Sequence, residues 1–169
     1  MYCIGDKIVY PMHGAGTIEA IEEKEILGQN RQYYILKMPC DDMKVMIPTD
    51  NNEEIGLRDV ITKKEIDEVI EYFAQYNEDI TANWNRRYRE NVVKMRSGNI
   101  YDVVQVVKTL MLRDKARGVS SGERKMLVSA RQILVSEIIL VQNRRKDDIE
   151  VLLAQIVEEQ ISITLLENL

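Results

Sequence analysis

The sequence predicts an α+β protein in which a small N-terminal antiparallel β-barrel precedes a compact all-helical domain of about five helices. Two observations lead to this prediction. Up to about residue 60, short runs of β-branched and aromatic residues alternate with turn-forming residues, which is the pattern of strands. Beyond that point, apolar residues recur at helical spacing. The pattern changes near residues 52–62, so we expect two domains that comprise residues 1–60 and 61–169.

Four short runs predict the strands of the first domain. Each is rich in β-branched or aromatic residues, and they lie at Lys7–Tyr10, Thr17–Ile21, Arg31–Met38 and Met43–Ile47. The segment between Thr17 and Lys37 predicts a long hairpin that turns at Gly28. Because a small sheet must protect its edge strands, closure into a barrel is the expected arrangement.

Five stretches predict the helices of the second domain. Thr62 and Glu65 form a capping box ahead of the first stretch, which fixes where that helix starts. The second helix is expected to end near Arg96 and the third near Arg117. The expected helices begin near Thr62, at Thr81 or Asn83, at Ile100, at Ser120 and near Asp147.

Composition and residue spacing give no sign of a membrane protein or an enzyme. No apolar run approaches the roughly 18 residues that span a bilayer, and no secretory signal is visible. Cys3 and Cys40 stand alone in the sequence, which fits reduced thiols, so we expect a cytoplasmic location. His13 is the only histidine and lies in a turn, where a structural role is expected. We therefore expect no catalytic site, metal, cofactor or small-molecule substrate.

The net charge of −5 conceals a basic block in the middle of the chain. Residues 80–146 contain fifteen Lys and Arg against five Asp and Glu, whereas the segments on both sides are acidic. This asymmetry favours a polyanionic partner, such as nucleic acid, for that block alone. A charged helical surface that only keeps the protein solvated is the alternative, and charge by itself leaves both open.

The first half of the basic block surrounds the only tryptophan, Trp84, in the expected first turn of a helix. A flat ring beside guanidinium groups suits a minor-groove wedge or a stacking platform for an unpaired base. The N-terminus of the helix adds backbone N–H groups that can bind phosphate oxygens. In the alternative, Trp84 anchors the packing of two helices. A second basic cluster around residues 118–122 extends a phosphate-binding surface or only solvates a turn. The two groups are Arg86, Arg87 and Arg89 beside Trp84, and Arg113, Lys115, Arg117, Arg124, Lys125 and Arg131 around that turn.

Four segments have a recognisable sequence. They are Val9–Gly16 (VYPMHGAG), Thr81–Tyr88 (TANWNRRY), Ser121–Leu127 (SGERKML) and Ala130–Val135 (ARQILV). Together and in this order they resemble the CarD family, also called CdnL, of bacterial transcription regulators. The similarity extends from about residue 2 to residue 157. The first domain is also similar to the RNA polymerase-interacting domain of transcription-repair coupling factors.

The resemblance implies a fold, two partners and a set of contact residues. The first domain is then a Tudor-like or SH3-like barrel that binds the β subunit of RNA polymerase. The helical domain contacts promoter DNA at the upstream edge of the transcription bubble, and the complex favours the open promoter. Trp84 then wedges into the minor groove and Arg86 and Arg89 hold the phosphate backbone. The full DNA-binding set that we expect is Trp84, Arg86, Arg87, Arg89, Arg124 and Lys125.

The chain departs from this family at two polymerase-facing positions. Well-known members carry arginines where this chain has Lys24 and Met46, so Lys24 keeps the charge without the bidentate fork and Met46 keeps neither. The tail 161–169 has no counterpart that the resemblance can place. The chief rival function is a protein–protein adaptor whose basic helical face binds an acidic protein. An RNA-binding barrel is disfavoured because the first domain is acidic.

Overall fold

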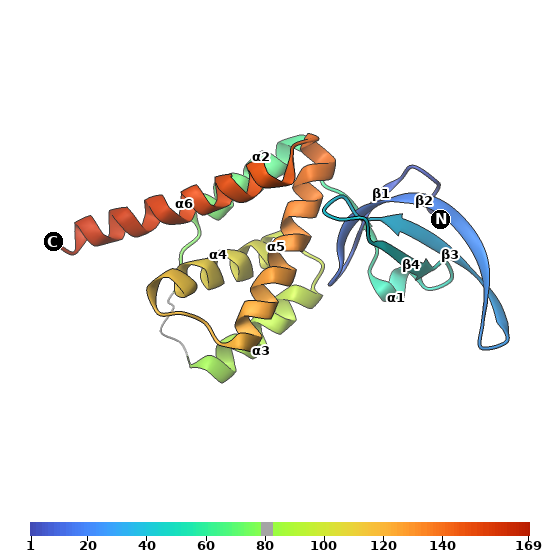
Figure 1. Cartoon of the computed structure of the whole chain (residues 1–169), viewed down its shortest axis with the longest axis horizontal. Helices are drawn as coiled ribbons and strands as arrows, with labels where there is room; N and C mark the ends of the chain where they lie inside the picture. The colour runs from blue at the N-terminus through green and yellow to red at the C-terminus, as the bar shows by residue number, and fades with distance from the viewer. Residues whose placement is uncertain (79–82) are drawn as a thin grey trace.

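The computed structural model describes residues 1–78 and 83–169 and confirms the predicted α+β fold. Within these residues, an antiparallel sheet of five strands is followed by a domain of long helices, and the two lie side by side (Figure 1). No helix in the described part is long and apolar enough to cross a membrane. Thr81, one of the two residues expected to cap the helix of Trp84, lies outside the described residues.

The sheet has the order β4-β3-β2-β1-β5, and each neighbouring pair of strands is antiparallel. The predicted hairpin is confirmed, because β2 and β3 are joined at Leu27 and Gly28, both of which have positive φ. In the described residues, β4 and β5 form the edges, and the sheet curves without closing by hydrogen bonds (Figure 1). The strands are β1 (Lys7–Tyr10), β2 (Gly14–Ile26), β3 (Gln29–Lys37), β4 (Lys44–Pro48) and β5 (Arg58–Asp59).

The helices form where the capping residues predict. Thr62 caps the first long helix and Ser120 caps the fourth, each in a complete capping box. A short helix, α1 (Asn52–Ile55), occupies the region in which the sequence indicated only a domain boundary. The other helices are α2 (Lys63–Gln75), α3 (Trp84–Arg96), α4 (Ile100–Ala116), α5 (Ser121–Gln142) and α6 (Lys146–Glu167).

The helical core is built around α4 and α5, whose apolar faces pack on each other and on α2 and α6. Lys108 on α4 is fully buried, and its Nζ donates to the carbonyls of Phe73 and Ala74 at the end of α2. It thus satisfies carbonyls that a helix C-terminus leaves unpaired. Burial lowers the pKa of Lys108 to about 8. Although Lys108 belongs to the basic block of the sequence, it adds nothing to the charge of the surface.

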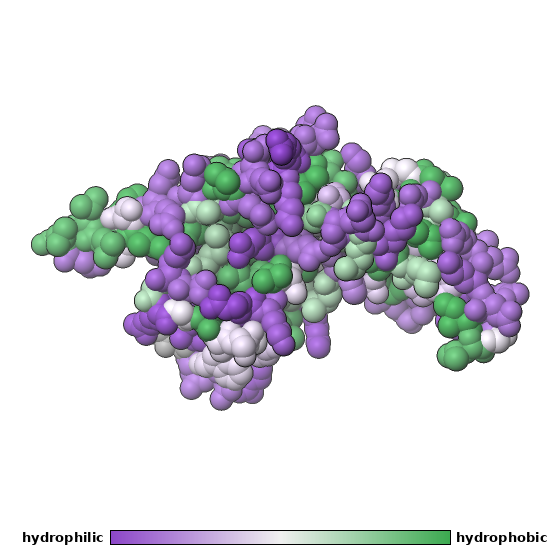
Figure 2. Space-filling model, in the orientation of Figure 1, coloured by the Kyte–Doolittle hydropathy of each residue, from purple (hydrophilic) through white to green (hydrophobic). Residues whose placement is uncertain are grey.

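The tail that the sequence left unplaced continues α6 to Glu167. This end of the helix projects from the body (Figure 1), and Figure 2 shows hydrophobic side chains gathered on it. Ile163, Leu165 and Leu166 are all more than half exposed there.

The two domains touch where β2 begins. Gly14 and Ala15 lie against the middle of α5, and the backbone N–H of Ala15 donates to Ser136 Oγ over 2.9 Å in a buried setting. A Cβ on Gly14 would lie 2.7 Å from Ser136 Oγ and 3.4 Å from the Cα of Ile133. Gly14 is therefore required both by its φ of +109° and by the close approach of the helix.

We expect Gly14→Ala to lower the free energy of unfolding by roughly 3 kcal/mol, because a positive φ and crowding against α5 add together. Gly5→Ala is the matched control, since Gly5 has a φ of +94° with nothing within 4 Å of an added Cβ. It should lose about 1–2 kcal/mol, from backbone strain alone. Denaturant unfolding of both variants measures the difference, and equal losses would show that α5 does not crowd Gly14.

Candidate nucleic-acid interface

Trp84 opens α3 and stays partly exposed. Asn83 caps the helix by accepting from the N–H of Asn85, and the indole stacks on Tyr88 one turn later at 5.2 Å between ring centres. Its Nε1 donates to Ser120 Oγ over 3.1 Å, which ties the ring to the start of α5. The residue is still 44% exposed. Trp84 thus helps to join two helices and also presents an aromatic surface to solvent.

Arg87, which the sequence placed in the DNA-binding set, is buried. It is 5% exposed, and its Nε donates to Glu123 Oε1 over 2.7 Å. Glu123 is 1% exposed and is the capping-box residue of α5, so this ion pair fixes the start of α3 on the first turn of α5. The burial argues against the expected phosphate contact of Arg87.

Burial alone would raise the pKa of the Glu123 carboxyl. The hydrogen bond from Arg87, the hydrogen bond from the Ser120 backbone and the Arg87 charge act in the opposite direction and outweigh it. The pKa of Glu123 is therefore lowered, and the pair is ionised at neutral pH.

Arg86 and Arg89 lie on the exposed side of α3. Arg86 Nε donates to Glu90 Oε1 over 2.8 Å in an exposed pair one helical turn apart. That hydrogen bond lowers the pKa of the Glu90 carboxyl. Arg89 Nε donates to the backbone carbonyl of Asn85. Both guanidinium groups therefore reach solvent close to Trp84. An exposed ion pair such as Arg86–Glu90 is weak, so a phosphate could displace it at little cost in free energy.

Arg124 and Lys125 are exposed in the first turns of α5, beside the residue that binds the indole. Arg124 contacts Asp114 at 3.4 Å, with its side chain 62% exposed. A mainly apolar hollow separates α3 from α5 and is lined by Tyr88 and Lys125. Met12, from the turn between β1 and β2, lines the same hollow, so the first domain also reaches this surface. Sequence reasoning missed Met12, because nothing local marks its position.

Lys115 and Arg131 of the second basic cluster make their contacts elsewhere. Lys115 pairs with Glu158 on α6 at 2.9 Å. Arg131 lines a different cavity, together with Cys40 and Lys146. Within the described residues, no group of three or more His, Cys, Asp or Glu side chains is placed to hold a metal.

The two residues expected to face the polymerase lie on one face of the sheet. Cross-strand partners project to the same side, and the register pairs Met46 with Ile35 and Lys24 with Arg31. Positions 31 and 35 are an even number apart on β3, so Lys24, Arg31 and Met46 share a face. Met46 is 44% exposed, and Lys24 contacts Glu22 at 3.1 Å. Arg31 was not predicted, because only the strand register reveals its place opposite Lys24.

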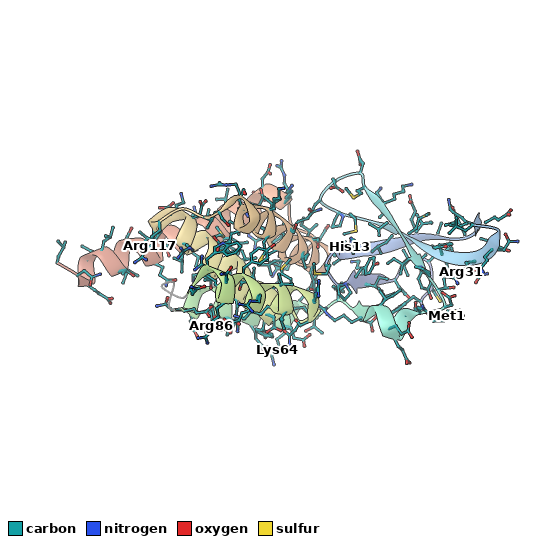
Figure 3. All side chains as sticks on the ribbon, turned by 90° about the horizontal axis from the view of Figure 1, so that it is seen from below. Met1, His13, Arg31, Lys64, Arg86 and Arg117 are labelled. Carbon is teal, nitrogen blue, oxygen red and sulfur yellow. The ribbon has the colours of Figure 1, made fainter. Side chains whose placement is uncertain are left out.

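The polymerase-facing and DNA-facing candidates are far apart. Figure 3 shows Arg31 near one end of the molecule, on the β2–β3 hairpin, and Arg86 in the helical half. His13 lies between them, near the junction of the domains, and its ring stacks on Tyr10 at 4.2 Å.

Comparisons with known proteins match two different families to the two parts of the chain. Residues 2–61 match the family described as the CarD-like/TRCF RID domain, and residues 68–154 match the family described as the CarD C-terminal domain. A Bacillus subtilis (strain 168) protein with the name "Putative transcription factor YdeB" is 39% identical over 142 residues, which are 84% of this chain and 93% of that protein. The chain therefore belongs to the CarD family of transcription factors.

Proposed function

We propose that this protein stabilises the open promoter complex by binding the RNA polymerase β subunit through its sheet and promoter DNA through its helical domain. The observation that carries the proposal is the exposed Trp84 ring, stacked on Tyr88 and flanked by Arg86 and Arg89. A transcription factor of this kind acts in the cytoplasm, on the nucleoid, through its contact with polymerase.

The proposed effect on DNA rests on a higher affinity of the protein for melted DNA than for closed duplex. At the upstream edge of the bubble, base pairs are already partly unstacked, so a wedging or stacking ring gains contacts there that closed duplex does not offer. A protein that binds the melted state more tightly than the closed state shifts the equilibrium towards melting by that difference. In this proposal Trp84 is the wedge, and Arg86, Arg89, Arg124 and Lys125 hold phosphates.

The proposed contact with polymerase rests on the sheet face that carries Lys24, Arg31 and Met46, and on the edge strand β4. In the described residues β4 is an edge strand, which can add to a sheet of a partner protein. Lys24 and Arg31 supply positive charge on the same face of the sheet as the apolar Met46. In this proposal, Arg31 supplies the guanidinium that the chain lacks at positions 24 and 46.

The open-complex lifetime on a promoter tests the proposal. With the full-length protein present, complexes of polymerase and promoter DNA should survive a competitor challenge longer than without it. A Lys24→Glu, Arg31→Glu variant should lose the effect through loss of polymerase binding while still binding fork DNA. A lifetime that does not change when the wild-type protein is added contradicts the proposal.

Salt dependence separates DNA from an acidic protein as the partner of the basic face. Four phosphate contacts predict that affinity for fork DNA falls by roughly a hundredfold between 50 and 200 mM salt. Arg124→Gln with Lys125→Gln should reduce the slope of log affinity against log salt by about two. Lys63→Gln with Lys64→Gln, on the exposed start of α2, is the control and should leave the slope unchanged. Equal slopes for all three proteins would remove α5 from the DNA contact.

A further inference from the structure

The domains are joined by a second contact, centred on a buried carboxylate. Glu137 lies in the C-terminal half of α5 and is 1% exposed. Its Oε1 accepts from Arg58 Nη1 over 2.8 Å, and its Oε2 accepts from Arg58 Nη2 over 3.0 Å, which makes a bidentate pair. Oε1 also accepts from the backbone N–H of Ile61, in the linker, over 3.1 Å.

Arg58 extends this contact to the helix that carries Trp84. It lies on β5, and its Nε donates to the backbone carbonyl of Gly98 over 2.8 Å. Gly98 belongs to the turn between α3 and α4. One guanidinium therefore links the sheet to α5 and to the end of α3, while the Arg87–Glu123 pair fixes the start of α3.

We propose that Arg58 and Glu137 are positioning residues that fix the distance and angle between the polymerase-binding face and the Trp84 surface. The inference rests on the function proposed above. A buried ion pair adds little stability compared with apolar side chains of similar size, but its fork geometry permits only one arrangement of the elements that it joins.

Fixed geometry matters because the protein must contact two sites on one assembly. Once the sheet is bound to polymerase, the effective concentration of Trp84 at the bubble edge depends on how narrowly the domains are held. Without the Arg58–Glu137 pair, the junction retains the Gly14–Ser136 contact and the hydrogen bond from Lys7 Nζ to the Leu140 carbonyl. Pro11 also stays beside Gly98, and Met12 still lines the hollow between α3 and α5. These apolar contacts have no fixed direction, so without the fork of Arg58 the Trp84 surface can shift relative to the sheet.

The test is the double variant Arg58→Met, Glu137→Met in the full-length chain. Replacing both charges avoids a buried unpaired carboxylate, so the protein should fold. Polymerase binding and fork-DNA binding, measured separately, should stay within about twofold of wild type. The increase in open-complex lifetime should fall by about tenfold, because only the joint contact needs fixed geometry. Glu158→Gln, which removes the exposed Lys115–Glu158 pair, is the control and should behave as wild type.

Arg58→Lys is the second variant, in case the double variant is unstable. It keeps the charge but loses the fork and so should show the same pattern to a smaller extent. A wild-type lifetime for either folded variant overturns the inference and leaves the proposed function intact. Equal losses in fork-DNA binding and in lifetime also overturn it, because they show a defect within the helical domain. Failure of wild type to prolong the lifetime overturns the proposed function instead.

Discussion

Glu123→Ala is expected to lower the free energy of unfolding by about 3–5 kcal/mol, the largest stability effect that we predict. The substitution leaves the guanidinium of Arg87 buried without its carboxylate and also breaks the capping box of α5. Both losses act where α3 meets α5, so the Trp84 surface should be lost together with the fold. Denaturant unfolding measures the change.

Glu90→Ala is the matched control, because Glu90 pairs with the neighbouring Arg86 on the same helix but in solvent. An exposed pair of this spacing is worth less than about 0.5 kcal/mol. If both variants lost a similarly small amount of stability, the Arg87–Glu123 pair would not hold α3 on α5.

The same pair predicts an acid-sensitive stability. Because the folded-state pKa of Glu123 is lowered, its contribution is complete above the unfolded value, about 4.3, and is lost as pH falls through the folded value. Wild type should therefore lose stability relative to Glu123→Gln as pH falls below about 4.3. A difference between the two proteins that does not change with pH would contradict the ionised pair.

Trp84→Ala is expected to weaken binding to fork DNA by about 5- to 150-fold, which corresponds to the 1–3 kcal/mol of one stacked base. Polymerase binding should not change, because Trp84 lies on the helical domain, away from the sheet face. Trp84→Phe keeps an aromatic face but loses the hydrogen bond to Ser120, so it should recover part of the affinity.

Denaturant unfolding of the same variants separates a loss of DNA contact from a loss of packing between α3 and α5. The indole is partly exposed, so we expect Trp84→Ala to cost less stability than the 3–5 kcal/mol of a fully buried tryptophan. An affinity loss that simply follows a loss of fold would mean that Trp84 serves only to pack α3 on α5.

The fold was predictable where local chemistry decides it. Capping boxes at Thr62 and Ser120 mark helix starts within the sequence, and Gly28 marks the hairpin turn. β5 was missed because it has only two residues, too few to show a period. α1 has four residues and contributes no buried side chain, so it left no apolar pattern either.

The sequence shows the candidate site in outline but not in detail. A single tryptophan among arginines at a helix start is visible in the sequence, and its exposure agrees with the proposed contact. Helical spacing cannot tell that Arg87 is buried while Arg86 is exposed, since the difference comes from Glu123, 36 residues away in the chain. The place of Arg31 opposite Lys24 depends on strand register, which only the folded sheet defines.

The fluorescence of Trp84 tests the central claim most directly, because the chain has no other tryptophan. Titration with fork DNA should quench or shift the emission as binding proceeds, and fully paired DNA of the same sequence should need a higher concentration to do so. Emission that stays constant while the labelled DNA shows binding by anisotropy would mean that the indole does not touch the melting duplex.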